Sequence, residues 1–331
     1  MEKRLYLVTG ADGHLGGTIL RQLIANEEEV RGLILPGNKK KFPGQVDYYE
    51  GNITDPDTLE NFFTFSGKRR VICIHTAGLV DISGKLNRRL YETNVLGTRN
   101  IIKMCVRHKV SRLIYTSSVH AIPENGKDGM IREIDDFSIY RLVEGGYAKT
   151  KAMATLCVLR AVQKGLDAVV LHPSGIIGPY ESPGNHLVQL IKDYMEGLLP
   201  ACVKGSYDFV DVRDIAEACI AAADKAQSGQ CYILSNKRYQ LSEILDIVRH
   251  YAGGPRLLVL PVFAARMMIP VLYVYSKLTK QRPLFTAYSL HTLGSNSYFS
   301  HEKAAMELGY HPRDIEETIR DTVDWISYGD I

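Results

Sequence analysis

The chain has 331 residues, 45% hydrophobic and 23% charged, which is typical of an ordinary soluble globular protein. Its formal net charge of +3 is too small to indicate nucleic acid as a partner. Its six cysteines include no CxxC pair, which indicates reduced thiols in a cytoplasmic protein and neither disulfides nor a metal site.

A glycine-rich turn joins the first expected strand to the first expected helix. An apolar run over residues 5–8 reads as a buried parallel strand, and apolar residues recur at helical spacing over 15–24. Between them lie Gly10, Gly13 and Gly16. The first permits a tight turn, the second lets the backbone approach a pyrophosphate, and the third lets the helix pack on the strand. We therefore expect a dinucleotide at the start of this helix, where free N–H groups favour an anion.

The second expected strand, residues 30–35, lacks the acidic residue that usually receives the adenosine ribose of NAD. Leu35 stands at its end, and Lys39, Lys40 and Lys41 follow. These lysines predict a pocket for the 2′-phosphate of NADP. A solvated basic loop, with NAD as the cofactor, is the alternative.

The remaining chain alternates strand and helix patterns. Strands are expected at 46–50, 71–75, 111–117, 167–172 and 230–234, and helices near 55–66, 85–107, 140–164, 184–197, 212–226 and 240–252. Strands separated by helices predict right-handed crossovers, hence an α/β fold with a doubly wound parallel (Rossmann) sheet. We assign residues 1–172 with 206–235 to a dinucleotide-binding domain. Residues 173–205 and 236–331 then form a small, mostly helical substrate-binding region.

Two tyrosine–lysine pairs have the four-residue spacing that places both side chains on one face of a helix. They are Tyr147 with Lys151 and Tyr273 with Lys277. Lowering the pKa of a tyrosine from about 10 to about 7 takes about 4 kcal/mol. A lysine ammonium about 4 Å away supplies roughly that at an effective dielectric of 20. Spacing alone does not decide between the two pairs.

Eight segments of the sequence indicate which of the two tyrosine–lysine pairs is catalytic. In chain order they read VTGADGHLG, GNITD, HTAG, NVLGT, YTSS, YAKTK, HPSGIIGP and FVDVRDIA. Together they resemble the extended short-chain dehydrogenase/reductases (the NAD-dependent epimerase/dehydratase superfamily), nearest to the 3β-hydroxysteroid dehydrogenase and dihydroflavonol reductase branch. The resemblance implies that Ser118, Tyr147 and Lys151 are catalytic, with Ser117 as the competitor for the serine role. Tyr273 is then a core or pocket-wall residue.

The same resemblance, together with the glycine turn and the lysines, implies which residues contact the cofactor and which contact the substrate. Those at the cofactor are Gly10, Gly13, His14, Leu15, Gly16, Lys39, Lys40, Asn52, Ile53, Thr76, Ala77, Gly78, Asn94, Tyr147, Lys151, Pro173 and Gly175. Those at the substrate are Ser118, Val119, His120 and Tyr147.

Departures from related motifs indicate the reaction. Val119 and His120 follow Ser118 where family dehydratases carry an acidic pair, and Gly175 stands where sugar-nucleotide epimerases have a phosphate-binding asparagine. The resemblance therefore implies an NAD(P)-dependent oxidoreductase that interconverts an alcohol and a ketone on a bulky, largely apolar substrate, steroid- or flavonoid-like. A nucleoside-diphosphate-sugar epimerase is the second hypothesis. A catalytically silent NADP-binding sensor is the third, although such proteins usually lose the tyrosine or the lysine.

The apolar stretch 257–280 is too interrupted to span a membrane, because Arg266, Pro261 and Pro270 fall within it. We expect a lid over the substrate pocket there, with peripheral membrane contact as the alternative. The resemblance also implies a homodimer formed through two of the long helices.

Overall fold

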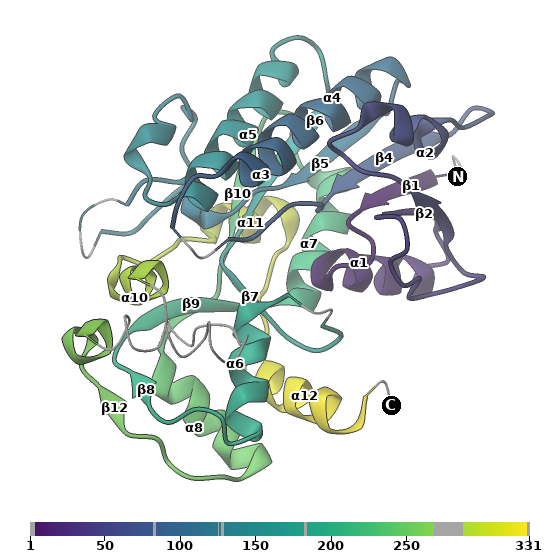
Figure 1. Ribbon diagram of the computed structural model, residues 1–331. Coiled ribbons are helices and arrows are strands. Elements are labelled where there is room, and N and C mark those ends of the chain that lie inside the picture. The colour runs from purple at the N-terminus through teal and green to yellow at the C-terminus, as the bar shows by residue number, and fades with distance from the viewer. Residues whose placement is uncertain are drawn as a thin grey trace.

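The computed structural model describes residues 4–81, 84–124, 126, 129–181, 184–267 and 287–329. These residues form two lobes, a larger one built on a parallel sheet and a smaller one of short strands and helices (Figure 1). Tyr273, Lys277 and the part of the predicted lid from residue 268 onward lie outside the described residues.

The larger lobe contains a seven-stranded sheet in which every neighbouring pair is parallel. In spatial order the strands are β10 (Cys231–Leu234), β6 (Ala168–Pro173), β5 (Arg112–Thr116), β4 (Arg70–His75), β1 (Arg4–Thr9), β2 (Glu29–Ile34) and β3 (Asp47–Glu50). This confirms the predicted doubly wound fold. The strand order reverses between β1 and β4, and ligands of such sheets bind outside the carboxyl ends of the strands at this point.

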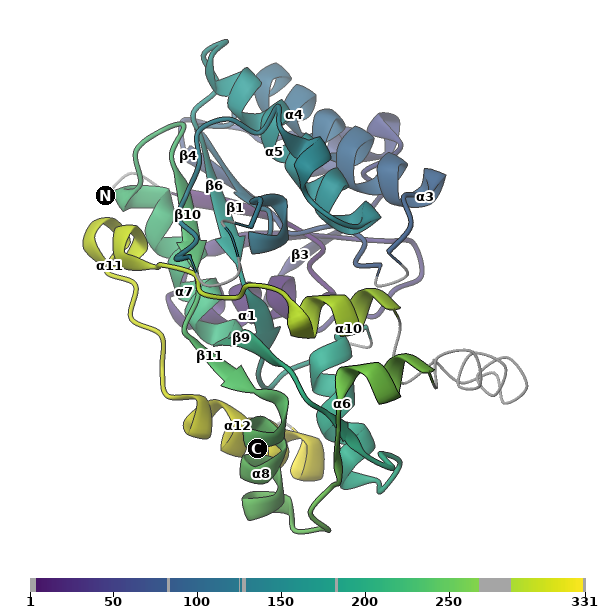
Figure 2. The same ribbon diagram turned by 90° about the vertical axis from the view of Figure 1, so that its left-hand side faces the viewer.

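Helices cover both faces of this sheet because its strands are apolar on both sides. Leu5 and Leu7 face the helices α4 (Thr98–Arg107) and α5 (Gly146–Val162), whereas Tyr6 and Val8 belong to the core under α1 (His14–Ala25) and α7 (Val212–Lys225). Figure 2 shows α4 and α5 on one side of the sheet and α1 and α7 on the other. The shorter elements of this lobe are η1 (Pro56–Leu59), α2 (Glu60–Phe63), α3 (Arg88–Tyr91), η2 (Glu92–Gly97), η3 (Val119–Ala121) and η4 (Tyr140–Leu142).

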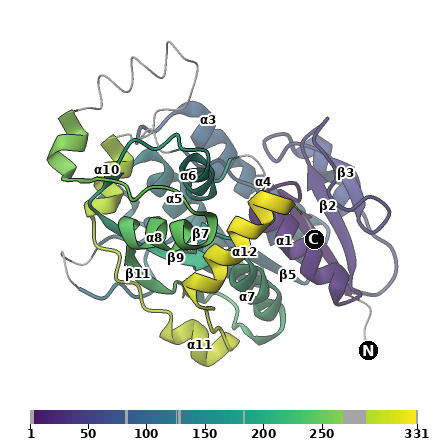
Figure 3. The same ribbon diagram turned by 90° about the horizontal axis from the view of Figure 1, so that it is seen from below.

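The smaller lobe contains strands that the sequence patterns did not reveal. In its three-stranded sheet, β9 (Ser206–Asp211) lies between β7 (Gly175–Ile177) and β11 (Lys237–Gln240), and β8 (Cys202–Val203) pairs separately with β12 (Val259–Leu260). The helices of this lobe include α6 (His186–Met195), α8 (Leu241–Ala252), α10 (Ala287–Gly294) and α12 (Ile315–Tyr328), and residues 262–267 are helical as well. Figure 3, the view from below, shows α8 and α12 beside one another.

The chain returns to the larger lobe before its last helix. The helix α11 (Glu302–Leu308) packs on α7 and β10. Lys225 Nζ donates to the carbonyl oxygen of Leu308 at 2.9 Å, and the Tyr232 hydroxyl donates to Glu307 at 2.6 Å. The chain then crosses back to form α12 against α8.

Candidate active site

The glycine turn lies at the sheet's switch point and brings two backbone segments into close contact. Gly10 has a left-handed φ of +68°, and the N–H of Gly13 donates to the carbonyl oxygen of Gly10 at 2.9 Å. A Cβ at Gly16 would lie 2.0 Å from that same oxygen, so only glycine fits there. Gly13 caps α1 without a side chain, and the first turn of α1 carries no acidic residue. This turn therefore fits a dinucleotide pyrophosphate.

His14, the first residue of α1, connects this turn to the smaller lobe. Its Nε2 lies 2.8 Å from the carbonyl oxygen of Pro179, and its Nδ1 lies 2.9 Å from Nδ2 of Asn185, the residue that caps α6. Burial lowers the pKa of His14 to about 4, so the ring is neutral at pH 7. A neutral Nε2–H tautomer satisfies both contacts.

Of the three lysines in the loop after β2, two point into solvent and one contacts the glycine turn. Lys39 and Lys40 are exposed. Lys41 instead reaches the glycine turn, where its Nζ donates to the carbonyl oxygen of Gly13 at 3.1 Å. The sequence reading also missed a carboxylate in this region, since Asn38 donates a hydrogen bond to Asp12 of the glycine turn.

The residues predicted around adenine and along the cofactor lie at the ends of β3 and β4. Asn52 is exposed and accepts the N–H of Thr54 at 3.0 Å, whereas Ile53 is buried. Thr76 donates to the carbonyl oxygen of Thr9 at 2.7 Å, which fixes the segment Thr76–Gly78 beside the glycine turn.

Asn94 fixes the next stretch of chain. It is buried in the π-helical turn η2, where it accepts the N–H of Leu79 at 2.8 Å and donates to the carbonyl oxygen of Leu79 at 3.0 Å. It also donates to the hydroxyl of Thr150 on α5 at 3.1 Å. Asn94 thus connects the end of β4 to the helix that carries Tyr147 and Lys151.

The two serines after β5 have different surroundings. The Ser117 hydroxyl lies 2.7 Å from the Thr155 hydroxyl in the buried contact between β5 and α5. Ser118 accepts the N–H of His120 at 3.3 Å, and its side chain lies close enough to Tyr147 to lower the pKa of that phenol. Ser118 therefore lies on the Tyr147 side, and Ser117 serves the packing of α5.

Burial controls the electrostatics of Tyr147 and Lys151. It raises the pKa of Tyr147 to about 12, whereas the nearby Ser118 side chain acts to lower it. It lowers the pKa of Lys151 to about 8. The Lys151 ammonium donates to the carbonyl oxygen of Thr116 at 2.8 Å and lies 5.2 Å from the ring centroid of Tyr115. In the chain alone the pKa of this tyrosine therefore lies above its usual value, because loss of hydration outweighs the effect of Ser118, and Lys151 is not among the groups that shift it.

The imidazole of His120 lies among three phenols, one of which is Tyr147. The His120 ring centroid lies 6.2 Å from that of Tyr147, 5.7 Å from that of Tyr207 and 6.3 Å from that of Tyr288. Tyr207 comes from β9 and Tyr288 from α10, and the sequence reading missed both because neither belongs to a motif. Val119, which was predicted at the substrate, is 1% exposed and packs in the core beneath α5.

Strand β6 contacts the backbone of Ser118 through His172. The Nδ1 of His172 lies 2.9 Å from the carbonyl oxygen of Ser118, and its ring stacks on Phe137 at 5.3 Å. Pro173 ends β6 and is buried. A Cβ at Gly175 would lie 2.8 Å from both the Tyr207 ring and the carbonyl oxygen of Asp208, so no larger side chain fits at this position.

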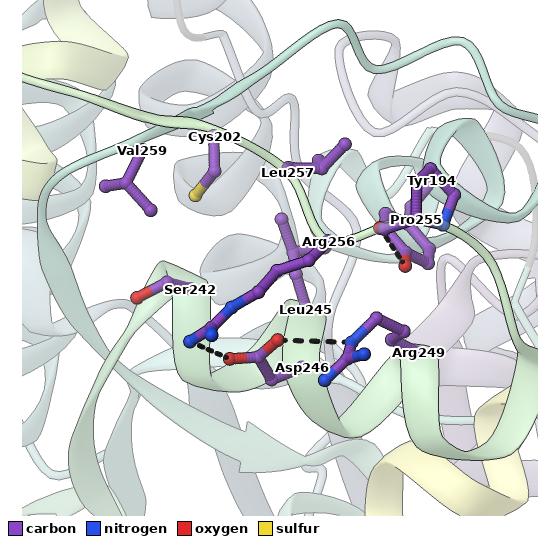
Figure 4. Close-up of a pocket in the computed structure, with 10 residues that line it drawn as sticks. All are labelled: Tyr194, Cys202, Ser242, Leu245, Asp246, Arg249, Pro255, Arg256, Leu257 and Val259. Atoms are coloured by element: carbon purple, nitrogen blue, oxygen red, sulfur yellow. Dashed lines mark hydrogen bonds and ion pairs between the residues drawn. The ribbon is translucent and has the colours of Figure 1, made fainter.

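A separate cavity of about 90 Å³ lies in the smaller lobe, between α8 and the segment that leads into β12 (Figure 4). Asp246 at its edge is paired with Arg249 at 3.3 Å and with Arg256 at 3.6 Å. Ser118, Tyr147 and Lys151 do not line it. Within the described ranges there is no cluster of three or more His, Cys, Asp or Glu residues able to hold a metal ion. None of the helices in that part of the chain is long and apolar enough to cross a membrane.

A parallel sheet with a dinucleotide turn at its switch point, followed by Ser118, Tyr147 and Lys151 beyond the next strands, defines a class: the nicotinamide-dependent oxidoreductases of the short-chain type. Comparison with known proteins agrees. Residues 6–236 match the model of the NAD dependent epimerase/dehydratase family. The chain belongs to this family and is an NAD(P)-dependent dehydrogenase or reductase.

Several characterised proteins are similar to this chain over nearly their whole length. Sterol demethylase protein B of Methylococcus capsulatus is 28% identical, covering 96% of this chain and 97% of the relative. The sterol-4-alpha-carboxylate 3-dehydrogenase (decarboxylating) of Schizosaccharomyces pombe is 31% identical, with 97% and 96% covered. Among solved structures, gox2253 has a TM-score of 0.78 at 27% identity, with 98% of each chain covered. The Thermus thermophilus UDP-glucose 4-epimerase complex with NAD has a TM-score of 0.75 at 21% identity, covering 98% of this chain and all (100%) of that one, a likeness of fold alone.

Proposed function

We propose that the protein interconverts a secondary alcohol and a ketone on a bulky, largely apolar substrate, and that Ser118, Tyr147 and Lys151 carry out the reaction. The observation that carries this proposal is the position of Ser118 and of His120, which follows it, beside Tyr147, with the buried Lys151 one helical turn further on. The presence of all three residues also argues against a silent NADP-binding sensor.

The proposed roles follow from the contacts of each group. Ser118 accepts the backbone N–H of His120, which leaves its hydroxyl hydrogen to donate to the reacting oxygen. Tyr147 gives or takes the proton of that oxygen. Lys151, with a pKa of about 8, is mostly protonated at pH 7 and can bind the nicotinamide ribose while its charge favours the phenolate. The bound nicotinamide supplies or accepts the hydride, and its oxidised form adds positive charge beside Tyr147.

Two observations support an apolar substrate over a nucleoside diphosphate sugar. Two of the relatives described above are named for sterols, and another, 28% identical, is a "putative dihydroflavonol 4-reductase" of Synechocystis. Gly175 is crowded by Tyr207 and Asp208, so the asparagine that epimerases use to hold the phosphate has no room in this backbone.

Turnover assays test this assignment. The full chain, with NADPH or NADH, is incubated with steroid ketones, flavonoid-like ketones and aldehydes, and UDP-sugars are assayed separately for interconversion. We expect nicotinamide oxidation with at least one ring ketone. Interconversion of UDP-sugars without activity on any apolar ketone would favour the epimerase. Binding of NADPH without hydride transfer to any of these substrates would favour the sensor.

We propose NADP as the preferred cofactor, because no carboxylate ends β2 and three lysines follow it. Lys41, at the glycine turn, is the best placed of them for a phosphate. One observation favours NAD as the second candidate, namely the Asp12 carboxylate next to Asn38, which would repel a 2′-phosphate and could accept a ribose hydroxyl. The dissociation constants of NADPH and NADH, measured for the wild type, Lys41→Ala and Asp12→Asn, decide. NADP preference requires tighter NADPH binding that weakens in Lys41→Ala.

We also propose a homodimer formed through the helices that carry Asn94 and Tyr147. Large apolar side chains are exposed along this part of the chain, with Leu86 49%, Val106 58% and Leu142 68% exposed. Light scattering of the purified protein measures its mass directly. A monomeric mass at micromolar concentration would contradict the proposal.

A further inference from the structure

His14 and Asn185 form a bridge between the glycine turn and the smaller lobe. His14 is the first residue of α1, and its ring lies between the carbonyl oxygen of Pro179, 2.8 Å from Nε2, and the amide nitrogen of Asn185, 2.9 Å from Nδ1. A carbonyl oxygen can only accept, so Nε2 carries the hydrogen of the neutral ring and Nδ1 accepts from Asn185. Both ring nitrogens therefore bond to the chain that follows β7.

Asn185 extends this contact to two elements of the smaller lobe. Its amide nitrogen also donates to the carbonyl oxygen of Ile176 on β7 at 2.9 Å. Its side-chain oxygen accepts the N–H groups of Leu187 at 2.9 Å and Val188 at 3.3 Å, which is the cap that starts α6. One amide hydrogen is thus used for His14, the other for β7, and both acceptor positions for α6. This side chain fixes α1, β7 and the start of α6 relative to one another.

The cofactor-binding end of α1 also holds Tyr180, in the same segment after β7. Lys41 Nζ donates both to the carbonyl oxygen of Gly13, at 3.1 Å, and to that of Tyr180, at 3.4 Å. The guanidinium of Arg21 on α1 lies 4.2 Å from the centroid of the Tyr180 ring. Tyr180 has a left-handed φ of +66°, which residues other than glycine rarely adopt and which persists only where the surroundings hold it.

A dinucleotide at the glycine turn would bond to the N–H groups of the first turn of α1, which have no partner within the helix. The backbone of His14 belongs to this turn, whereas its ring bonds to the smaller lobe. We infer that His14 is a positioning residue, which acts through Asn185 so that cofactor binding stabilises the start of α6 and β7. β7 carries Gly175, which leaves no room for a Cβ beside the Tyr207 ring, so the smaller lobe is thereby set for the substrate. The effect on the substrate rests on the proposed function, whereas the response to the cofactor does not.

Hydrogen–deuterium exchange of the full chain, with and without saturating NADPH or NADH, tests the response to the cofactor. In the wild type we expect the cofactor to slow exchange of the amides of residues 187–190 by about fivefold or more. His14→Phe keeps a ring but removes both hydrogen bonds, so the slowing at α6 disappears while that at the glycine turn remains. His14→Gln restores most of it, because its amide offers one donor and one acceptor.

Two further variants separate the bridge from general stability. Asn185→Ser keeps an oxygen able to cap α6 but is too short to bond to His14, so it also abolishes the slowing. The double variant His14→Phe with Asn185→Ser loses no more than either single variant, because both remove the same contact. Gln22→Leu is the matched control on the same helix. Gln22 donates to the carbonyl oxygen of Arg213 at 2.9 Å, within the larger lobe, and this variant keeps the slowing.

Steady-state kinetics test the effect on the substrate, with the ketone that the turnover assays identify. In His14→Phe the substrate itself must stabilise the smaller lobe, so its KM should rise by about fivefold while kcat changes little. The dissociation constant of the cofactor should not rise, and KM should stay at the wild-type value in Gln22→Leu.

The possible failures are distinguishable. Slowing at α6 that persists in His14→Phe overturns the inference. Its loss in Gln22→Leu to the same extent shows a general loss of stability and also overturns it. Exchange at α6 that does not respond to the cofactor in the wild type, although titration shows the cofactor bound, overturns it as well. If no ketone is reduced, the proposed function fails, and the exchange experiment still decides the role of His14.

Discussion

At the scale of single residues, the surroundings of Tyr147 show what helical spacing can and cannot predict. The four-residue spacing places Lys151 and Tyr147 on one face of α5, and the structure has both there. Spacing does not determine where the end of a long side chain lies. The Lys151 ammonium donates a hydrogen bond to the carbonyl oxygen of Thr116. This contact depends on how β5 packs against α5, and no sequence pattern predicts it.

Removing the hydroxyl of Tyr147 deletes the proposed proton donor. We expect Tyr147→Phe to lower the rate of hydride transfer by roughly 10²–10⁴-fold, the usual contribution of general acid–base catalysis. Cofactor affinity should stay nearly unchanged, since the glycine turn is untouched, whereas Lys151→Ala should weaken both. Single-turnover absorbance of the nicotinamide and a cofactor titration give the two values. Tyr273→Phe is the control with the same spacing, and near-normal chemistry in Tyr147→Phe would reverse the assignment.

At the scale of elements, the large sheet and the helices α6 and α8 of the smaller lobe were predictable, and the strands of the smaller lobe were not. The central strands are short, almost wholly apolar runs such as residues 71–74, because both faces of a parallel sheet are covered. β7, β8, β11 and β12 have only two to four residues, too few for a pattern to show. Tyr207 and Tyr288 are two of 19 tyrosines, and only the folding of β9 and α10 against the end of β5 distinguishes them.

The start of α5 depends on a glycine that α10 packs against. Gly145 precedes the helix with a φ of +89°, and a Cβ there would lie 2.3 Å from the Tyr288 ring. We expect Gly145→Ala to cost about 1–3 kcal/mol in backbone strain and further stability by displacing Tyr288. Substrate KM should rise while cofactor affinity changes little.

Urea unfolding and steady-state kinetics measure these two effects. Gly253→Ala is the matched control, because Gly253 has a φ of +77° and no atom within 4 Å of an added Cβ. It should show the backbone strain without the rise in KM. Equal KM values for the two variants would mean that Tyr288 does not contact the substrate.

At the scale of the whole molecule, four histidines, two of them buried and two half-buried, make stability depend on pH. Burial lowers the pKa from 6.5 to about 4 in His14, His120 and His172 and to about 3 in His75. As pH falls through 6.5 the unfolded chain binds these protons and the folded chain does not. Stability is therefore lost as pH falls from about 6.5 towards 4, by up to about 1.4 kcal/mol per pH unit for each group. Asp208 acts in the opposite direction, because burial raises its pKa from 3.8 to about 7.

We accordingly expect the free energy of unfolding in urea to fall between pH 7 and pH 5. Its slope against pH should be at most about three times that of a single titrating group, since four histidines act in one direction and Asp208 in the other. His75→Gln tests one contribution, since an amide can bond to Thr9 and Thr98 as the ring does but does not titrate. Its slope should be shallower by up to about 1.4 kcal/mol per pH unit. A free energy that does not change between pH 7 and pH 5 would contradict this account.

The return of the chain to the larger lobe through α11 determines how the protein unfolds. Because α11 belongs to the larger lobe while α10 and α12 on either side of it belong to the smaller one, neither lobe is a continuous piece of chain. Neither can then melt while the other stays intact, as two domains joined by one linker often do. We expect a single calorimetric transition whose measured enthalpy equals the van't Hoff enthalpy. A nascent chain would likewise lack a complete larger lobe until α11 has left the ribosome.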